Sequence, residues 1–268
     1  MARIALIIPA RFASSRFPGK PLAPLAGPDG GVRTLLEWTW AAGGAVPGIA
    51  QCVVATDDDR IADHARSAGM AVIMTPDTCL NGTERCAAAV PALAQMPDIV
   101  VNLQGDAPLI PAAMVTAVIE RLLADPRLAL ATAAVPASPA VLAHLQSDQA
   151  AGRVGGTTVV CDRRAQALYF SKSIIPHVAP GSVPAQPVLL HVGLYAYRPA
   201  ALNAYVAAGP AAIELQEGLE QLRFLDAGLR VGVAICPPPG WDLVELNNPT
   251  DTPLIEAQLA RRAAQEPA

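Results

Sequence analysis

Short continuous runs of apolar residues recur along this chain of 268 residues, without regular alternation of apolar and polar positions. Such runs predict strands that are buried on both faces, as in a sheet covered by helices on each side. The predicted strands are Ile4–Pro9, Gln51–Ala55, Ala71–Met74, Ile99–Leu103, Ala129–Ala134, Thr157–Cys161, Val188–Tyr197 and Val231–Ile235.

Segments with helical spacing of apolar residues lie between these runs. The predicted helices are Thr34–Ala42, Asp58–Ala68, Gly82–Leu93, Ala112–Leu123, Pro199–Ala207, Glu214–Ala227 and Thr252–Arg262. Because strands and helices alternate from the start of the chain, we expect an α/β sandwich with a mostly parallel sheet and right-handed crossovers. Ligands of such sheets bind at the carboxyl ends of the strands.

Residues 138–187 interrupt this alternation, because proline and glycine are frequent there. We interpret the segment as an excursion from the main sheet that forms, in part, a small subdomain. The remaining pattern predicts that residues 1–268 form a single domain around this insertion.

The composition favours a large buried core and excludes some partners. Hydrophobic residues make up 52% of the chain and charged residues 16%, against roughly 25% charged in a typical soluble domain. With 19 Lys and Arg against 23 Asp and Glu, the formal net charge is −4. This balance argues against broad binding of nucleic acid or anionic membrane, which requires clustered cations. Any recognition of phosphate must therefore be local.

The longest apolar stretches do not predict a membrane span, which requires roughly 20 consecutive apolar residues. The run Ile4–Ala10 is short, and Leu128–Ala143 is interrupted by prolines. The first residues lack the pattern of a secretory signal. The five cysteines form no CxxC pair, so neither a disulfide scaffold nor a zinc site is indicated. We expect a soluble cytoplasmic protein.

The loop after the first predicted strand carries three cations within ten residues, Arg11, Arg16 and Lys20. Small residues between them leave backbone N–H groups free to face a ligand. Several fixed positive charges with exposed N–H groups are suited to a triphosphate. The alternative, a solvated basic loop, is disfavoured because these cations lie among Pro, Gly and Ser directly after a buried strand.

A second loop follows the strand Ile99–Leu103 and places Asp106 beside Gly105. A carboxylate at this position is a candidate ligand for a hard cation such as Mg²⁺. Taken alone, an Asx turn or a helix cap is an equally good interpretation. The basic loop favours the metal, because Mg²⁺ accompanies triphosphates.

These two loops together resemble the nucleotidyltransferases that activate sugars, and more closely the 3-deoxy-manno-octulosonate (KDO) cytidylyltransferase family. The resemblance extends in order over nearly the whole chain, and its first motif is highly specific. The matching segments are Ile8–Leu22, Val53–Asp57, Asn81–Arg85, Val101–Pro108, Ala167–Ser171, Ile175-Pro176, His191–Tyr197 and Leu219–Arg223.

The resemblance implies a three-layer α/β/α nucleotidyltransferase fold (GT-A-like) with a mostly parallel mixed sheet. It also implies a reaction in which the anomeric hydroxyl of a sugar acid attacks the α-phosphorus of CTP, with Mg²⁺, giving a CMP-sugar and pyrophosphate. Such enzymes supply precursors of lipopolysaccharide and other surface polysaccharides. We further expect a homodimer formed through the insertion around residues 138–187.

Roles for individual residues follow from the matched motifs. In-line phosphoryl transfer requires positioning and neutralisation of charge more than covalent chemistry. Lys20, Asp106 and Arg11 are the expected catalytic residues, and Asp106 and Asn247 the expected metal ligands. The expected nucleotide contacts are Arg11, Ser14, Arg16, Lys20, Arg85 and Gln104. The expected contacts to the sugar acid are Lys172, His191, Tyr195, Glu220 and Gln221.

Some of these residues also have structural interpretations. Arg85 lies on a predicted helix and could form a surface ion pair. Tyr195 and Tyr197 alternate along one strand, so one of them is expected in the core. His191 alone would more often be structural, and its His-x-Gly-x-Tyr context raises the functional interpretation.

The chain departs from the family at the second metal ligand, where Asn247 stands in place of Asp. An Asn carbonyl can coordinate Mg²⁺ but brings no negative charge. Glu245 could contribute instead. As a structural alternative, Asn247 or Asn248 would cap the following helix, with Pro249 at its first position.

Further departures surround the expected acceptor site. Ala107 stands where the family has the Glu that follows the metal-binding Asp, and Thr158 stands where it has Lys. Lys172 replaces an Arg, and Leu190 replaces a basic residue. A change from Arg to Lys is not conservative where a carboxylate is bound by two hydrogen bonds. We therefore hypothesise that nucleotide activation is retained while the acceptor differs from KDO. The alternatives are a related nucleotidyltransferase with another acceptor or nucleotide, and a CTP-binding protein with reduced catalysis.

Overall fold

The structure is a computed structural model that describes residues 2–14, 16–179 and 182–265. The chain divides into two compact units. Residues 1–116 and 239–268 belong to the first unit, and residues 117–238 to the second. The boundary at residue 116 falls within helix α4 (Ala112–Ala124).

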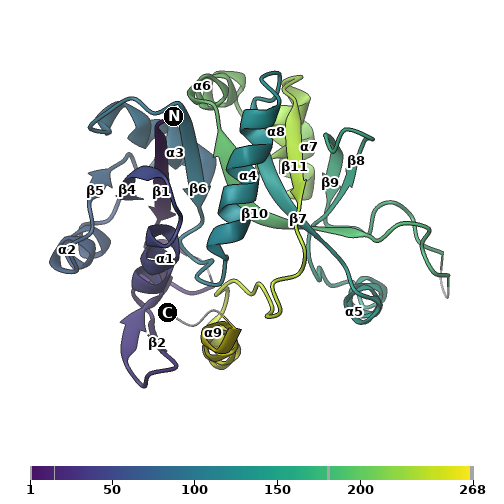
Figure 1. Ribbon diagram of the computed structural model, residues 1–268, viewed down its shortest axis with the longest axis horizontal. Helices are drawn as coiled ribbons and strands as arrows, with labels where there is room; N and C mark the ends of the chain where they lie inside the picture. The colour runs from purple at the N-terminus through teal and green to yellow at the C-terminus, as the bar shows by residue number, and fades with distance from the viewer. Residues whose placement is uncertain (1, 15, 180–181, 266–268) are drawn as a thin grey trace. The chain divides into compact units, whose positions relative to one another are not determined.

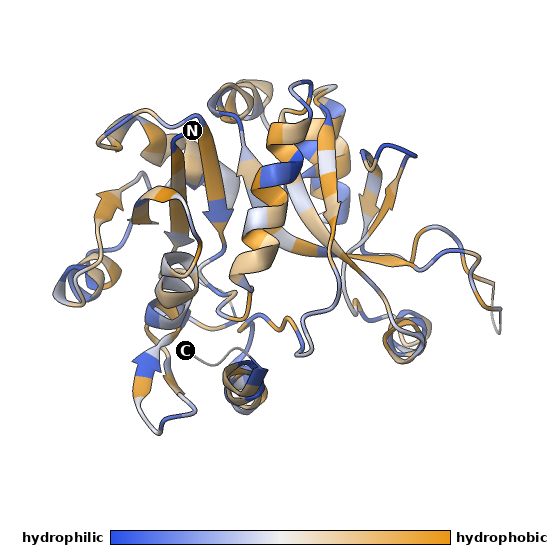
Figure 2. Cartoon of the chain, viewed as in Figure 1, coloured by the Kyte–Doolittle hydropathy of each residue, from blue (hydrophilic) through white to orange (hydrophobic). Residues whose placement is uncertain are grey.

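The first unit is built on four parallel strands, which Figure 1 shows side by side. Their order is β6 (Ile99–Leu103), β1 (Ile4–Ala10), β4 (Ile49–Thr56) and β5 (Val72–Met74). Every residue of β1 is buried, as its unbroken apolar run predicts. Figure 2 shows the same strands dominated by hydrophobic residues.

Helices and a short hairpin complete the first unit. The helices are α1 (Leu35–Gly44), α2 (Asp59–Ser67), α3 (Gly82–Ala89) and α9 (Thr252–Gln265), with short 3-10 helices at Lys20–Leu22, Val90–Ala92 and Pro249–Asp251. The hairpin pairs β2 (Pro24–Ala26) with β3 (Val32–Thr34).

A small second core in this unit joins the C-terminal segment to the loop that contains Asp106. The indole of Trp241 donates to the carbonyl of Leu109 at 2.8 Å, and the backbone N–H of Leu246 donates to the carbonyl of Asp106 at 3.2 Å. The buried members of this core are Ala23, Leu25, Leu35, Leu109, Trp241, Leu246, Ile255 and Leu259. Burial of these side chains holds residues 242–248 beside Asp106.

The second unit contains a mixed arrangement of strands. Strand β7 (Leu130–Pro136) runs parallel to β11 (Val231–Ile235) and antiparallel to β10 (Leu189–Tyr197). Strand β8 (Thr158–Cys161) pairs antiparallel with β10 on one side and with β9 (Ala167–Ser171) on the other, and β8 and β9 form a hairpin. The helices of this unit are α5 (Pro139–Ala150), α6 (Pro199–Ala208), α7 (Ala212–Glu217) and α8 (Leu222–Asp226).

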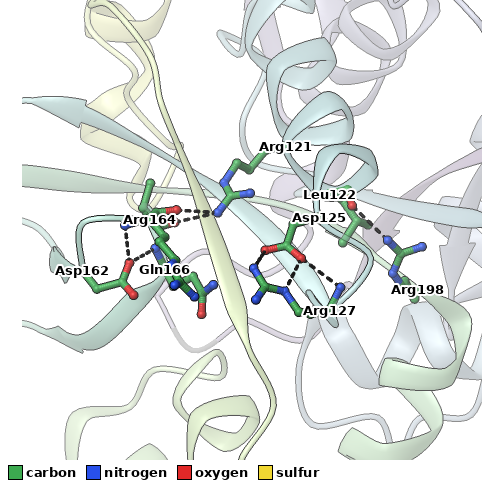
Figure 3. Close-up of polar contacts among 9 residues, drawn as sticks. Arg121, Leu122, Asp125, Arg127, Asp162, Arg164, Gln166 and Arg198 are labelled. Atoms are coloured by element: carbon green, nitrogen blue, oxygen red, sulfur yellow. Dashed lines mark hydrogen bonds and ion pairs between the residues drawn. The ribbon is translucent and has the colours of Figure 1, made fainter.

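An arginine secures the turn of the β8–β9 hairpin. Arg121 donates to the carbonyl of Arg164 at 2.8 Å, as Figure 3 shows. It also donates to the carbonyl of Ala165 at 3.3 Å. Asp162 accepts from the backbone N–H groups of Arg164 and Gln166, each at 2.8 Å. The turn is thereby fixed by polar contacts.

The predicted α/β class with a mostly parallel, mixed arrangement of strands is confirmed, and all eight predicted strands are present within a few residues of their expected bounds. The single helix expected at 214–227 is wrong. The chain breaks there into α7 and α8, because Gly218 adopts a left-handed conformation (φ 63°) that ends the first helix.

The segment 138–187 holds more regular structure than its prolines indicate, namely α5, β8 and β9. Pro139 occupies the first turn of α5, where proline is tolerated, and so does not prevent the helix. A small dimerisation subdomain here stays a prediction. None of the helices in the described ranges has the length and apolarity that a bilayer crossing needs.

Candidate active site

A cavity of about 290 Å³ lies at the carboxyl ends of β1 and β6 in the first unit. It brings together all the residues predicted to contact nucleotide or metal. These are Arg11, Ser14, Arg16, Lys20, Arg85, Gln104, Asp106 and Asn247. Residues separated by more than 200 positions in the sequence therefore converge on one pocket, as the rule for parallel sheets predicts.

The basic loop that follows β1 is folded onto itself. The backbone N–H of Gly19 donates to the carbonyl of Phe12 at 2.9 Å. The guanidinium of Arg60, from α2, lies over the Phe12 ring, 3.3 Å from its centroid. Asp58 orients this guanidinium through two hydrogen bonds of 3.0 and 2.7 Å. Contacts outside the cavity thus support the loop that carries its cations.

The loop after β6 presents Asp106 to this basic loop. A Cβ atom at Gly105 would lie 2.7 Å from the carbonyl oxygen of Pro9, so only glycine permits this close approach to β1. The Asp106 carboxylate contacts Nζ of Lys20 at 2.5 Å, and both side chains are partly buried. Helix α4 begins only at Ala112, so Asp106 is not its cap.

The wall formed by α3 contains a buried cation. The side chain of Asn81 caps this helix by accepting from the N–H of Glu84 at 2.9 Å. Arg85 is only 3% exposed, donates to Oγ1 of Thr75 at 2.6 Å and pairs with Asp57 at 3.0 Å. The pair is therefore not on the surface as considered above: Arg85 is buried, and Asp57 is half-buried. Sequence reasoning missed Asp57 as its partner, although Asp57 ends a matched motif.

The loop before α9 closes the cavity on the side of Arg16. Oδ1 of Asn247 accepts from Nη2 of Arg16 at 2.8 Å. The cap of the following 3-10 helix is Asn248, with Pro249 at its first position, and Asp251 accepts from the N–H groups of Asn247 and Asn248. The capping alternative therefore applies to Asn248, and the side chain of Asn247 faces the cavity.

The ionisation of Glu245 is influenced by the charges of Asp106, Lys20 and Arg16. Removal from water and the nearby carboxylate of Asp106 raise the pKa of Glu245 to about 7, against opposing effects of Lys20, Asn247 and Arg16. The residue as a whole nevertheless keeps an exposed surface.

The second unit brings together residues predicted to contact the sugar acid. The hydroxyl of Tyr195 donates to Oε1 of Gln221 at 3.2 Å. Gln221 is 2% exposed, and its Nε2 has no hydrogen-bond partner among the residues that the structure describes. A buried donor of this kind is costly unless a ligand satisfies it. Tyr195 and Tyr197 are both buried, so the core holds both rather than one.

His191 is held as a neutral imidazole in this cluster. Its ring lies 5.0 Å from that of Phe170 and 5.6 Å from that of Tyr195, and its Nε2 is 2.9 Å from Oγ1 of Thr132. Burial lowers the pKa of His191 to about 3. At neutral pH it therefore offers hydrogen bonds and no charge.

Glu217 fixes the end of β9 next to Lys172. Its carboxylate accepts from Oγ of Ser171 at 2.8 Å and from the backbone N–H of Lys172 at 3.0 Å. The ammonium of Lys172 passes over Gly218, at 2.8 Å from the point that a Cβ would occupy. Glu220 lies in the same turn, between α7 and α8. No motif in the sequence indicated Glu217.

Thr158, at the position where the family has Lys, has a structural use. Its hydroxyl contacts the carbonyl of Ser173 at 2.7 Å and the N–H of Ile175 at 3.1 Å. The side chain is 1% exposed. The Thr158 side chain therefore fixes the conformation of the segment after β9 by hydrogen bonds.

Comparison with known proteins agrees with this geometry. Residues 5–231 match the family model described as Cytidylyltransferase. The 3-deoxy-manno-octulosonate cytidylyltransferase of Maricaulis maris is 43% identical, over 96% of this chain and 97% of that protein. The mitochondrial enzyme of Arabidopsis thaliana with the same name is 37% identical, over 87% and 76%.

A solved structure gives the same result. CMP:2-keto-3-deoxy-manno-octonic acid synthetase complexed with CTP is 31% identical and superimposes with a TM-score of 0.82, covering 97% of this chain and 99% of that one. From the motifs, the cavity and these likenesses, the chain belongs to the 3-deoxy-manno-octulosonate cytidylyltransferase family.

Proposed function

We propose that this protein transfers CMP from CTP to the anomeric hydroxyl of a 3-deoxy-ulosonic sugar acid, KDO or a close relative, and releases pyrophosphate. The reaction is Mg²⁺-dependent and supplies a precursor of lipopolysaccharide or another surface polysaccharide. The observation that carries this proposal is the convergence of Arg11, Arg16 and Lys20 with Asp106 in one cavity.

The three cations neutralise the triphosphate. Arg11 and Arg16 hold phosphate oxygens by charge-assisted hydrogen bonds. Lys20 exchanges its contact with Asp106 for the phosphates and stabilises the charge that develops on the leaving pyrophosphate. Ser14, Gln104 and the buried Arg85 complete the nucleotide contacts, with the Asp57 pair keeping Arg85 in the wall.

The donor groups fit Mg²⁺. Asp106 supplies a carboxylate, and Asn247 or Glu245 a further oxygen. Within the described ranges, no three His, Cys, Asp or Glu side chains form a group suited to a metal ion. Mg²⁺ keeps several waters and takes other ligands from substrate phosphates, so two oxygens from the protein would be enough to hold it. When bound, it polarises the phosphate and neutralises charge.

The cluster in the second unit binds the sugar acid. The unpartnered Nε2 of Gln221 donates to a sugar oxygen, while Tyr195, neutral His191 and Glu220 supply further hydrogen bonds. Lys172 is the cation for the carboxylate. Because Thr158 and Leu190 replace basic residues, the acceptor site holds less positive charge than the family pattern, and we propose that its preferred acceptor differs from KDO.

A screen of pyrophosphate release over four nucleoside triphosphates and several ulosonic acids tests the proposal. We expect turnover with CTP and Mg²⁺ and an acceptor other than KDO as the best substrate. Efficient turnover of KDO without preference for another acceptor would refute the altered specificity. CTP binding without pyrophosphate release from any acceptor would favour the second candidate, a CTP-binding protein, which the replacements Asn247 and Ala107 suggest.

We also propose that the protein acts in the cytoplasm as a homodimer, through the segment around 138–187. Sedimentation at micromolar concentration tests the dimer. Cell fractionation tests the location.

A further inference from the structure

A carboxylate of α7 holds the backbone around Lys172, at the end of β9. Oε1 of Glu217 accepts from Oγ of Ser171 at 2.8 Å, and Oε2 accepts from the backbone N–H of Lys172 at 3.0 Å. Oγ of Ser171 in turn accepts from the backbone N–H of Ser173 at 3.0 Å. Ser171 is only 4% exposed, and Glu217 is half-buried. Both oxygens of Glu217 are therefore engaged in fixing the chain at Lys172.

The side chain of Lys172 crosses the glycine that follows Glu217. Its Nζ lies 2.8 Å from the point that a Cβ at Gly218 would occupy, so a side chain at position 218 would displace the ammonium. Gly218 also has a φ of 63°, which glycine adopts without strain. The backbone and the ammonium of Lys172 are thus both placed by the two residues at the end of α7.

The turn that begins at Gly218 also carries a buried amide donor. The N–H groups of Gly218 and Leu219 donate to the carbonyl of Glu214 at 2.7 and 3.2 Å, which fixes the start of the turn. Gln221 follows, with an Nε2 that has no hydrogen-bond partner among the residues that the structure describes. One short segment, 217–221, therefore holds both a cation and an amide donor, which together are suited to a carboxylate.

We infer that Glu217 is a positioning residue, which fixes Lys172 so that its ammonium lies over Gly218 and binds the carboxylate of the acceptor. A lysine side chain is flexible, and holding its backbone in place beforehand lowers the entropy lost on binding. Glu217 acts through Lys172 and does not itself bind the acceptor. This inference rests on the proposed function, because it assumes that a sugar acid binds at Lys172.

Steady-state kinetics with KDO as the acceptor, at saturating CTP and Mg²⁺, test this role. We expect Glu217→Ala to raise the KM for KDO about tenfold, since Lys172 is no longer held, and to change kcat and the KM for CTP less than about twofold. Glu217→Gln keeps an acceptor for the Lys172 N–H and a donor for Ser171, so its KM should stay within about threefold of the original. Glu120→Ala removes the same charge from an exposed position on α4 and is the matched control.

A change of acceptor separates the positioning of Lys172 from a general structural role. The carboxamide of KDO has nearly the same shape as KDO but lacks the charge that Lys172 binds. With this acceptor, Glu217→Ala should raise the KM less than about twofold. In a Lys172→Ala background, Glu217→Ala should raise the KM for KDO no further. A general loss of structure would instead weaken the binding of both acceptors alike.

The variant Gly218→Ala tests the place of the ammonium directly. The added methyl group would displace the Lys172 ammonium, and we expect the KM for KDO to rise about fivefold. Gly228→Ala is the matched control, because Gly228 also has a positive φ, of 70°, and a Cβ there would meet no atom of the described residues within 4 Å beyond its chain neighbours. Both variants should lose similar stability in urea, and only Gly218→Ala should raise the KM for KDO.

The inference is overturned if Glu217→Ala leaves the KM for KDO unchanged, or raises the KM for the carboxamide equally. Equal rises in Gly218→Ala and Gly228→Ala would show that backbone strain, and not the ammonium, is responsible. Thermal unfolding verifies that each variant is folded, and if Glu217→Ala is not, Gly218→Ala is compared on the two acceptors instead. Failure of the unmodified protein to release pyrophosphate with any ulosonic acid would refute the proposed function.

Discussion

The ammonium of Lys20 and the carboxylate of Asp106 are in direct contact, with 2.5 Å between Nζ and Oδ2, although 86 positions separate them in the chain. The two groups come from the loops after β1 and β6, which meet because these strands are parallel neighbours. The proposed reaction uses both groups but requires them to separate, since Lys20 must reach phosphate while Asp106 holds the cation. Under the proposed reaction, the pair would serve binding rather than stability.

Replacement of Asp106 by Asn tests this interpretation. We expect Asp106→Asn to lower kcat at least 100-fold, because a carboxylate that holds the cation is lost. The free energy of unfolding should change by less than about 1 kcal/mol, since the Lys20 pair is partly solvated. Pyrophosphate release and urea unfolding measure the two effects. An equal loss of stability and activity would favour a structural role.

The stack of Arg60 on Phe12 should preorganise the basic loop, which we propose binds the phosphates. Removing it with Arg60→Ala should weaken CTP binding about two- to fivefold, the value of an exposed cation–π contact, with kcat nearly unchanged. Arg66→Ala is the matched control, because Arg66 lies on the same helix, is exposed and pairs with Asp63. Equal effects of the two variants would show that only net charge matters.

A buried ion pair in the second unit should support the turn that carries Gln221. Arg223 contacts both oxygens of Glu214 at 2.7 Å, and both residues are nearly inaccessible to solvent. Burial opposes ionisation, but Arg223 lowers the pKa of Glu214 overall. Arg223→Met would leave the carboxylate buried and unpaired, at a cost of about 3–5 kcal/mol.

Urea unfolding measures this cost. The variant Arg127→Met is the control, because Arg127 is exposed and pairs with Asp125 in a surface turn, as Figure 3 shows. It should lose less than about 1 kcal/mol. A similar small loss in Arg223→Met would mean that the buried pair gives little net stability.

The parts of the fold that depend on local pattern could be predicted from the sequence. The buried strand β1 and its basic loop are examples, since an apolar run and its flanking residues are adjacent in the chain. The contact between Arg16 and Asn247 joins residues 231 positions apart, and no local pattern reports it. The helix expected at 214–227 failed because the one glycine in it ends α7.

The candidate site was likewise predicted from the sequence only in part. The motifs predicted that Asp106 and the three cations share a site, and the cavity confirms that they meet. The partners that orient these groups, such as Asp57 for Arg85 and Glu217 for the end of β9, were not predicted. Their side chains act through tertiary contacts, which a single sequence does not encode in any spacing.

The low pKa of His191 makes stability depend on pH in a defined window. Burial lowers its pKa from 6.5 to about 3, so between these values the unfolded chain binds a proton that the folded protein does not. The free energy of unfolding should therefore rise with pH across this window, by up to about 1.4 kcal/mol per pH unit from this residue, and level off above pH 6.5. His191→Gln should flatten the slope, whereas His177→Gln, at an exposed position, should not. Urea unfolding between pH 4.5 and 7.5 gives the slope, and the imidazole NMR signals of His191 should stay at their neutral positions down to about pH 5. A titration of His191 near pH 6.5 would contradict the burial argument and give it a charge in the acceptor cluster.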